Sequence, residues 1–130
     1  MEAVLITVRR LVALALAAPL LVLAAGTAHA AGNSVTINSA TGHGLGVSVN
    51  LTYSCLPGSG ITAASVTVIA SGNTAAGGSA VTCDGSAHTI DVGANCVLPS
   101  NNCHFVTGLG VTAYASLSSS VTDSKHLYLL

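Results

Sequence analysis

Residues 47–55 read Val-Ser-Val-Asn-Leu-Thr-Tyr-Ser-Cys, and this stretch decides the fold class. Apolar side chains occupy every second position from Val47 to Cys55, and small polar side chains fill the positions between them. Because successive side chains of a β-strand point to opposite faces, this alternation predicts a strand with one buried and one solvent-facing side. We therefore expect an all-β domain.

The same alternation recurs along the chain. It is clear in residues 109–117, and shorter runs predict further strands at 34–37, 65–70, 80–83, 88–92 and 125–130. Segments rich in Gly, Pro, Asn and Asp separate the runs and predict turns at 41–44, 57–60, 71–73, 84–86, 99–102 and 122–124. About seven short strands of this kind are typical of an immunoglobulin-like two-sheet sandwich, with a small Greek-key barrel as the alternative.

The first thirty residues have a different composition from the rest. Two arginines precede the apolar segment 11–25, and residues 28–30 (Ala-His-Ala) place small side chains where a signal peptidase cleaves. The pattern predicts a helical signal peptide in residues 1–30 and a single secreted domain in residues 31–130. The apolar segment is shorter than the roughly 20 residues of a membrane-spanning helix. We therefore expect no membrane attachment after cleavage, and an extracellular or cell-surface location.

All four cysteines lie after the predicted leader: Cys55, Cys83, Cys96 and Cys103. An even number of cysteines in an exported chain predicts two disulfides, for which three pairings exist. We favour Cys55–Cys83, because Cys55 ends an inward-facing series and Cys83 lies in register with the inward Val81. We favour Cys96–Cys103 because the two residues enclose a loop marked by Pro and Asn.

Residues 31–130 carry very few charges: Asp84, Asp91, Asp123 and Lys125. A surface without clustered Lys and Arg has no electrostatic attraction for nucleic acids or anionic lipids, which excludes those partners. Few charges also leave strand edges poorly protected. The uncharged, β-prone segment 65–70 and the apolar terminus 127–130 therefore predict self-association, unless a partner covers them.

The ionisable residues form no recognisable catalytic motif. Asp84 and Asp123 stand in predicted turns, and Asp91 alternates outward on a predicted strand. Ser86 and His88 lie close to Asp91 in sequence, but neighbouring strand residues face opposite sides and cannot form a relay. We expect no enzyme activity.

The histidines and cysteines lack the paired spacings of structural zinc sites. His43 and His104, in or beside predicted loops, are the least unsuitable ligands. We expect no metal and no cofactor.

The composition of residues 31–130, rich in Ala, Gly, Ser, Thr and Val, resembles that of small secreted bacterial immunoglobulin-like proteins such as the neocarzinostatin-like apoproteins. The resemblance implies a sandwich with two disulfides and, by function, a small-molecule carrier. The pair Cys55 and Cys83 is farther apart than in that family, so no binding residues are transferred from it.

The function expected from these observations is a secreted, non-catalytic binding module for an extracellular protein or small molecule. Recognition on a rigid sandwich usually uses the loops at its ends. The loop closed by Cys96 and Cys103 is the candidate surface, with these residues: Leu98, Asn101, Asn102, His104 and Phe105. The absence of Trp argues against a carbohydrate platform. The alternatives are a small-molecule carrier and a self-associating cell-surface protein.

Overall fold

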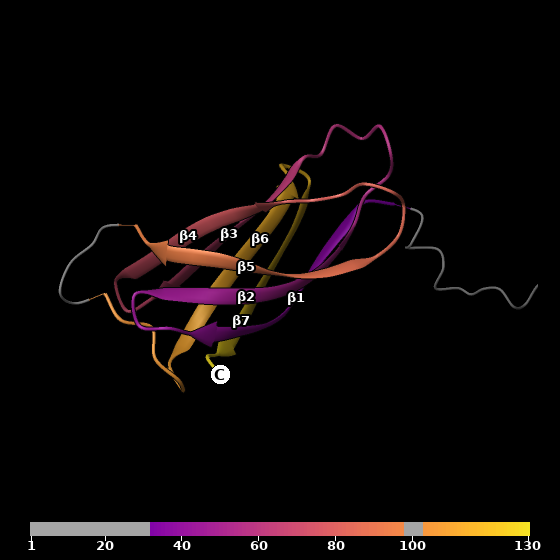
Figure 1. The fold of residues 1–130 in the computed structure, drawn as a ribbon. Coiled ribbons are helices and arrows are strands. Elements are labelled where there is room, and N and C mark those ends of the chain that lie inside the picture. Colours follow the sequence, from indigo (N-terminus) through magenta and orange to yellow (C-terminus); the bar gives the residue numbers. More distant parts are fainter. Residues whose placement is uncertain (1–31, 98–102) are drawn as a thin grey trace, which may run out of the picture.

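The computed structural model describes residues 32–97 and 103–130, and its regular elements are all β-strands (Figure 1). In these two ranges seven antiparallel strands follow one another: β1 (Ser34–Gly42), β2 (Gly46–Ser54), β3 (Ala63–Ala70), β4 (Asn73–Ala80), β5 (His88–Cys96), β6 (Gly110–Ser118) and β7 (Val121–Tyr128). Within the described residues no helix is long and apolar enough to span a membrane. The predicted signal peptide lies outside the described residues.

Strand β2 confirms the prediction made from residues 47–55. It pairs with β1 on one side and β5 on the other. Its alternate apolar side chains are buried, whereas Ser48, Asn50 and Thr52 are only half-buried. The core consists mainly of β-branched and small side chains; its largest fully buried members are Phe105, Ile37, Leu51, Val47, Val49, Val66, Val68, Val92 and Val111.

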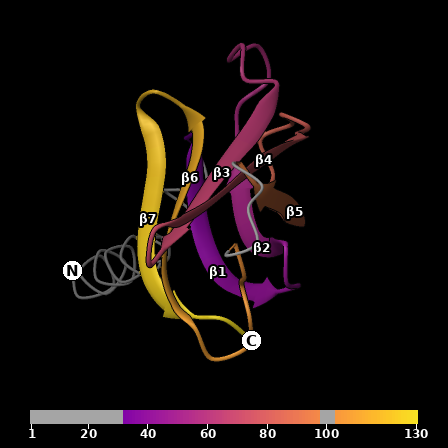
Figure 2. The same ribbon diagram turned by 90° about the vertical axis from the view of Figure 1, so that its left-hand side faces the viewer.

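The strand order is that of an immunoglobulin-like fold. The sheet runs β1-β2-β5-β4-β3-β6-β7. If the strands are lettered A to G in chain order, this is A-B-E-D followed by C-F-G, which are the two sheets of a constant-type domain. Here the β3–β4 hairpin joins the two halves, so one sheet folds over the core and nearly closes on itself (Figures 1 and 2).

Strand β4 corrects the prediction of a strand at residues 80–83. The strand lies earlier, at Asn73–Ala80, and residues 81–83 are outside it. Its sequence has two glycines and no large apolar side chain, so alternation could not reveal it. The two-residue turn Ser71-Gly72 connects β4 to β3. Both turn residues have positive φ, as a type I′ hairpin requires.

Strand β7 corrects a second prediction. Residues 122–124 were predicted as a turn and 125–130 as a strand, but the turn lies at residues 119–120 and β7 spans Val121–Tyr128. Asp123 is therefore a strand residue. Its carboxylate Oδ2 accepts a hydrogen bond of 2.8 Å from the backbone N–H of Ile37 on β1.

Side chains of β7 close the gap between the first and last strands of the sheet. Lys125 Nζ donates to the carbonyl oxygen of Ile37 at 2.7 Å, beside the Asp123 bond. Farther along β1, the backbone of Leu130 pairs with Ala40 and Gly42. We call these contacts the β1–β7 seam. They occupy backbone groups of β1 that a free sheet edge would expose to another chain.

The seam leads to a first prediction. Replacing Asp123 with Ala should lower the free energy of unfolding by about 1–3 kcal/mol, because the N–H of the buried Ile37 loses its acceptor. Asp123→Asn keeps an oxygen acceptor and should lose less. Urea denaturation measures the change, and hydrogen exchange at the Ile37 amide locates it. An exchange rate for Ile37 that is equal in Asp123→Ala and wild type would contradict the assigned contact.

The structure contains both disulfides in the predicted pairing, Cys55–Cys83 and Cys96–Cys103. The first joins the end of β2 to the segment before β5, and the second links the end of β5 to the segment before β6. Two disulfides indicate that the protein belongs in an oxidising, non-cytoplasmic environment.

The aggregation-prone segment 65–70 is not at an edge. It lies within β3, which pairs with β4 on one side and β6 on the other. At the terminus, Leu129 is buried while Tyr128 and Leu130 are exposed. The argument for self-association from residues 65–70 therefore does not apply to the folded chain.

Candidate functional site

The outer face of β3, β6 and β7 carries side chains in register across three strands. Strand pairing sets Thr67, Tyr114 and Ser124 in one row. The next row contains Ser65, Ser116 and Thr122. All six side chains bear a hydroxyl group. We call these two rows the hydroxyl face.

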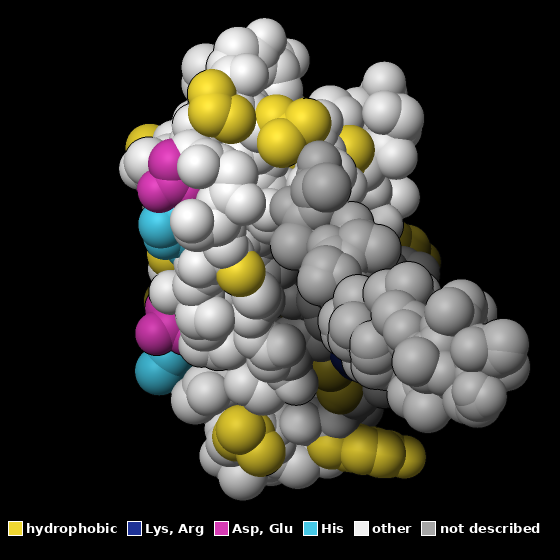
Figure 3. Space-filling view, turned by 90° about the vertical axis from the view of Figure 1, so that its right-hand side faces the viewer, with side chains coloured by type: hydrophobic (Ala, Val, Ile, Leu, Met, Phe, Trp, Pro, Cys, Tyr) yellow, Lys and Arg dark blue, Asp and Glu magenta, His cyan; other side chains and the backbone are white. Residues whose placement is uncertain are grey.

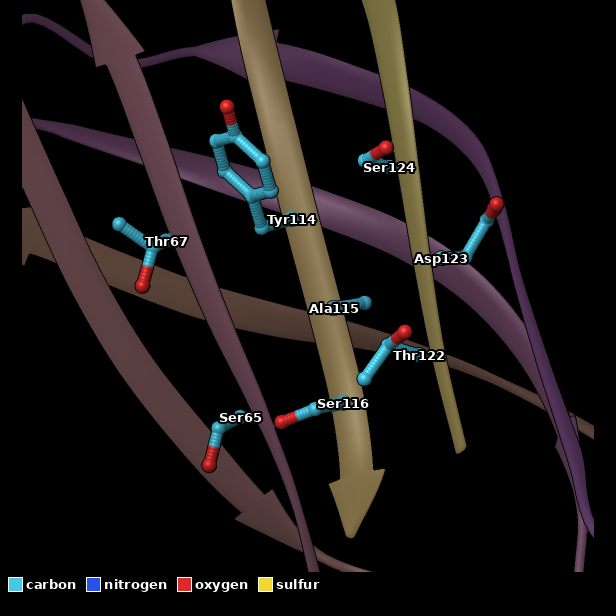
Figure 4. Close-up of a pocket in the computed structure, with 8 residues that line it drawn as sticks. All are labelled: Ser65, Thr67, Tyr114, Ala115, Ser116, Thr122, Asp123 and Ser124. Carbon is cyan, nitrogen blue, oxygen red and sulfur yellow. The ribbon is translucent and has the colours of Figure 1, made fainter. Parts of the chain in front are cut away.

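The hydroxyl face surrounds a shallow, solvent-open groove of about 310 Å³. The six hydroxyl-bearing residues line it together with Ala115 and Asp123, and Figure 4 shows them on three neighbouring strands. The ring of Tyr114 stands at the groove with 46% of the residue exposed. The groove therefore offers hydrogen-bonding groups around one accessible aromatic ring.

The groove offers a ligand almost no charged side chain. Its lining contains no Lys or Arg, and its only carboxylate is Asp123. That carboxylate lies on the β1 side of β7, away from Tyr114 in Figure 4, and binds the Ile37 N–H. Hydroxyl groups, which both donate and accept hydrogen bonds, dominate the remaining chemistry.

The same face continues beyond the groove toward the other end of β7. The next row contains Ile69, Thr112 and His126, and the Thr112 hydroxyl lies 3.0 Å from His126 Nδ1. Tyr128 follows, opposite Gly110. A Cβ atom at Gly110 would lie 3.3 Å from the Tyr128 ring, so the ring lies over this glycine. Tyr128 is 70% exposed.

The predicted binding loop is only partly described. Leu98, Asn101 and Asn102 lie outside the described residues. His104 is exposed, and its carbonyl oxygen lies 3.5 Å from the Asn73 side-chain amide.

Phe105 requires a correction. Its side chain is completely buried, and its backbone N–H and carbonyl pair with Gly44. The aromatic ring therefore packs in the core and presents no exposed surface to a ligand.

Exposed apolar residues lie at the end of the sheet where the C-terminus also lies (Figure 1). They are Leu45, Val97, Val106 and Leu130. We call them the apolar end. Backbone hydrogen bonds join their segments, including Cys96 N–H to the Leu45 carbonyl and Gly108 N–H to the Leu129 carbonyl. A depression of about 220 Å³ beside Leu45 also includes His43 and Asn95.

The remaining ionisable side chains form pairs and single contacts in the described part of the chain. Asp and His side chains follow one margin in Figure 3. His88 Nε2 lies 2.8 Å from Asp84 Oδ1, and the Ser86 backbone N–H donates to the same oxygen. These hydrogen bonds, led by His88, lower the pKa of Asp84 below its ordinary value of 3.8. Asp91 instead accepts from the Asn50 side chain.

The Ser86, His88 and Asp91 side chains are thus not joined as a relay. Across the described residues, His, Cys, Asp and Glu side chains nowhere gather in a group of three or more that could hold a metal ion.

Sequence reasoning missed the hydroxyl face because each strand alone shows only ordinary outward Ser and Thr. The signal was the alignment of Thr67, Tyr114 and Ser124 in one row across the sheet, which requires the β3-β6-β7 strand order.

Comparison with protein-family models, curated proteins and solved structures finds no match.

Proposed function

We propose that this protein is an extracellular, non-catalytic binding module that holds its ligand on the hydroxyl face. The observation that carries the proposal is the groove itself. Five Ser and Thr hydroxyl groups from three adjacent strands line it together with the exposed ring of Tyr114. Outward Ser and Thr residues are common on sheets, but here they line a concave surface beside one of only three tyrosines in the chain.

The surrounding framework supports this role. The groove residues stand on paired strands, and the β1–β7 seam and two disulfides restrain the sheet. A preorganised surface loses less conformational entropy on binding than a flexible loop does. Secretion, as expected from residues 1–30, would place the groove in contact with extracellular molecules.

The shape of the groove favours an extended ligand over a compact one. Pockets that enclose small molecules have volumes of about 300–1,000 Å³ and bury most of the ligand surface. The groove lies at the lower limit of that range and is open to solvent. A small-molecule carrier is therefore the weaker alternative.

A second candidate function rests on the apolar end. Leu45, Val97, Val106 and Leu130 expose apolar surface beside the segment predicted for recognition. Exposed apolar side chains grouped at one end are a feature of protein-binding surfaces. In this candidate function the protein is a protein-interaction module that binds its partner through the apolar end and not through the hydroxyl face.

Amide chemical shifts of isotope-labelled protein distinguish the two surfaces. We expect that at least one class among neutral oligosaccharides, aromatic acids and short peptides shifts the Thr67, Tyr114 and Ser124 amides. Tyr114→Ala should weaken that binding, and Val106→Ala should not. Shifts confined to the Leu45 and Val106 amides, or no shift with any class, would overturn the assignment to the hydroxyl face.

A further inference from the structure

Charge, hydrogen-bonding groups and aromatic rings on the outer face of β3, β6 and β7 together indicate a ligand class. We infer that this face binds a neutral polysaccharide as an extended chain. The inference rests on the proposed function, because it names the ligand of the same face. Each of the three properties supports it separately.

The first property is the lack of usable charge. Lys125 on β7 belongs to the opposite side of the strand from Ser124 and His126, and its ammonium group binds the Ile37 carbonyl. Asp123 binds the Ile37 N–H. A phosphorylated, sulfated or uronic-acid polymer would find no Lys or Arg side chain on the described part of this face. A neutral ligand would lose no ionic hydration on binding there.

The second property is the repeated hydroxyl array. Rows of side chains on a sheet recur about every 7 Å along the strands and about 4.8 Å across them. Sugar hydroxyls both donate and accept hydrogen bonds, as do the protein hydroxyls opposite them. Thr67, Ser116 and Ser124 can therefore pair with a sugar chain in either hydrogen-bonding sense.

The third property is a pair of exposed tyrosines on one face. Tyr114 and Tyr128 both point outward, and Gly110 leaves room for the Tyr128 ring to lie against the sheet. Tyr128 pairs with Gly110, four residues from Tyr114 on β6, which places the two about 14 Å apart along the strands. A tyrosine ring has an apolar face and a polar tip, which suits the C–H face and hydroxyl edge of a sugar ring.

The spacing of the tyrosines explains why an extended chain fits better than a single sugar. A ligand that contacts both rings must cross the row of Ile69, Thr112 and His126 between them. That row adds another hydroxyl and the imidazole. Two tyrosines thus supply the aromatic platform that the lack of Trp seemed to exclude.

Depletion from solution by insoluble polysaccharides tests the inference. The secreted protein is mixed with cellulose, chitin and β-1,3-glucan, and the protein remaining in the supernatant is measured. We expect saturable binding to at least one polymer. Tyr114→Ala and Tyr128→Ala should each weaken it about two- to tenfold. Tyr114→Phe should lose less than Tyr114→Ala, because it keeps the ring. Val106→Ala, at the apolar end, should bind as wild type does.

The outcomes separate this inference from the proposed function. Binding to none of the three polymers, with amide shifts of the hydroxyl face in the presence of another class of compound, would overturn the polysaccharide and leave the binding face. Polymer binding that both tyrosine variants retain at full affinity would overturn the site. Binding to polygalacturonate alone would overturn the neutral class. Circular dichroism of each variant shows whether a loss reflects unfolding.

Discussion

Replacing Phe105 with Ala is expected to destabilise the protein by about 3–5 kcal/mol, the usual range for truncating a fully buried aromatic side chain. Phe105 has the largest side chain among the fully buried residues of the core. In a domain of this size each kcal/mol lowers the melting temperature by about 4–8 °C. Urea denaturation followed by far-ultraviolet circular dichroism measures the loss directly.

The large expected effect follows from the close packing around Phe105, which lies against the β1–β2 hairpin. A Cβ atom at Gly42 would lie 2.5 Å from the Phe105 carbonyl oxygen, so the two backbones are in close contact there. The nearby Leu129 is also buried. Truncation would leave a cavity between segments that are already at their closest approach, and such a site cannot collapse to fill it.

Two variants serve as controls for the Phe105 experiment. Val106 is the next residue and is exposed, so Val106→Ala should change the unfolding free energy by less than about 0.5 kcal/mol. Phe105→Leu keeps most of the volume and should lose less than Phe105→Ala. If Phe105→Ala and Val106→Ala unfold at the same urea concentration, the ring is not part of the core.

Local periodicity was enough to predict the strands that carry the core. In β2 and β6, alternate apolar residues have no other explanation than one buried face. These strand predictions needed only neighbouring residues, and the structure confirms them. The pairing Cys55–Cys83 is confirmed as well, although the strand expected at 80–83, on which the inward placement of Cys83 rested, is absent there because residues 81–83 lie outside any strand.

The predictions that failed depend on partners distant in the chain. Asp123 was interpreted as a turn residue because Asp is common in turns, yet its partner Ile37 lies 86 positions earlier. The strand Asn73–Ala80 lacks alternating large apolar side chains, so only its backbone pairing with β3 reveals it. Gly77 illustrates this: a Cβ atom there would overlap the Gly93 carbonyl oxygen, so the glycine permits close contact with β5.

The candidate site followed the same division between local and distant information. Phe105 was assigned to the binding surface because it follows the loop closed by Cys96 and Cys103, but its backbone packs against Gly42 and Gly44, which lie in another hairpin. The hydroxyl face needs three strands in the order β3-β6-β7 before its rows exist. Its residues were visible in the sequence, whereas their arrangement was not.

The two disulfides are expected to contribute unequally to stability. Cys55 and Cys83 are separated by 28 positions, and Cys96 and Cys103 by 7. A longer closed loop removes more conformational entropy from the unfolded chain. The double replacement of Cys55 and Cys83 by Ala should therefore lower the free energy of unfolding by about 3–4 kcal/mol, and that of Cys96 and Cys103 by about 2–3 kcal/mol.

Hydrogen bonds around the first disulfide determine how the variant without it behaves. The Tyr53 hydroxyl accepts from the Thr82 N–H at 2.9 Å, and the Gly85 N–H donates to the Cys55 carbonyl. These contacts hold the segment before β5 in place without the covalent link, so the Cys55/Cys83 double variant should keep its fold at low temperature. Urea denaturation of both double variants under identical conditions gives the comparison. A larger loss on removing Cys96 and Cys103 would mean that the shorter bridge stabilises native contacts at the apolar end, and that loop entropy does not set the order.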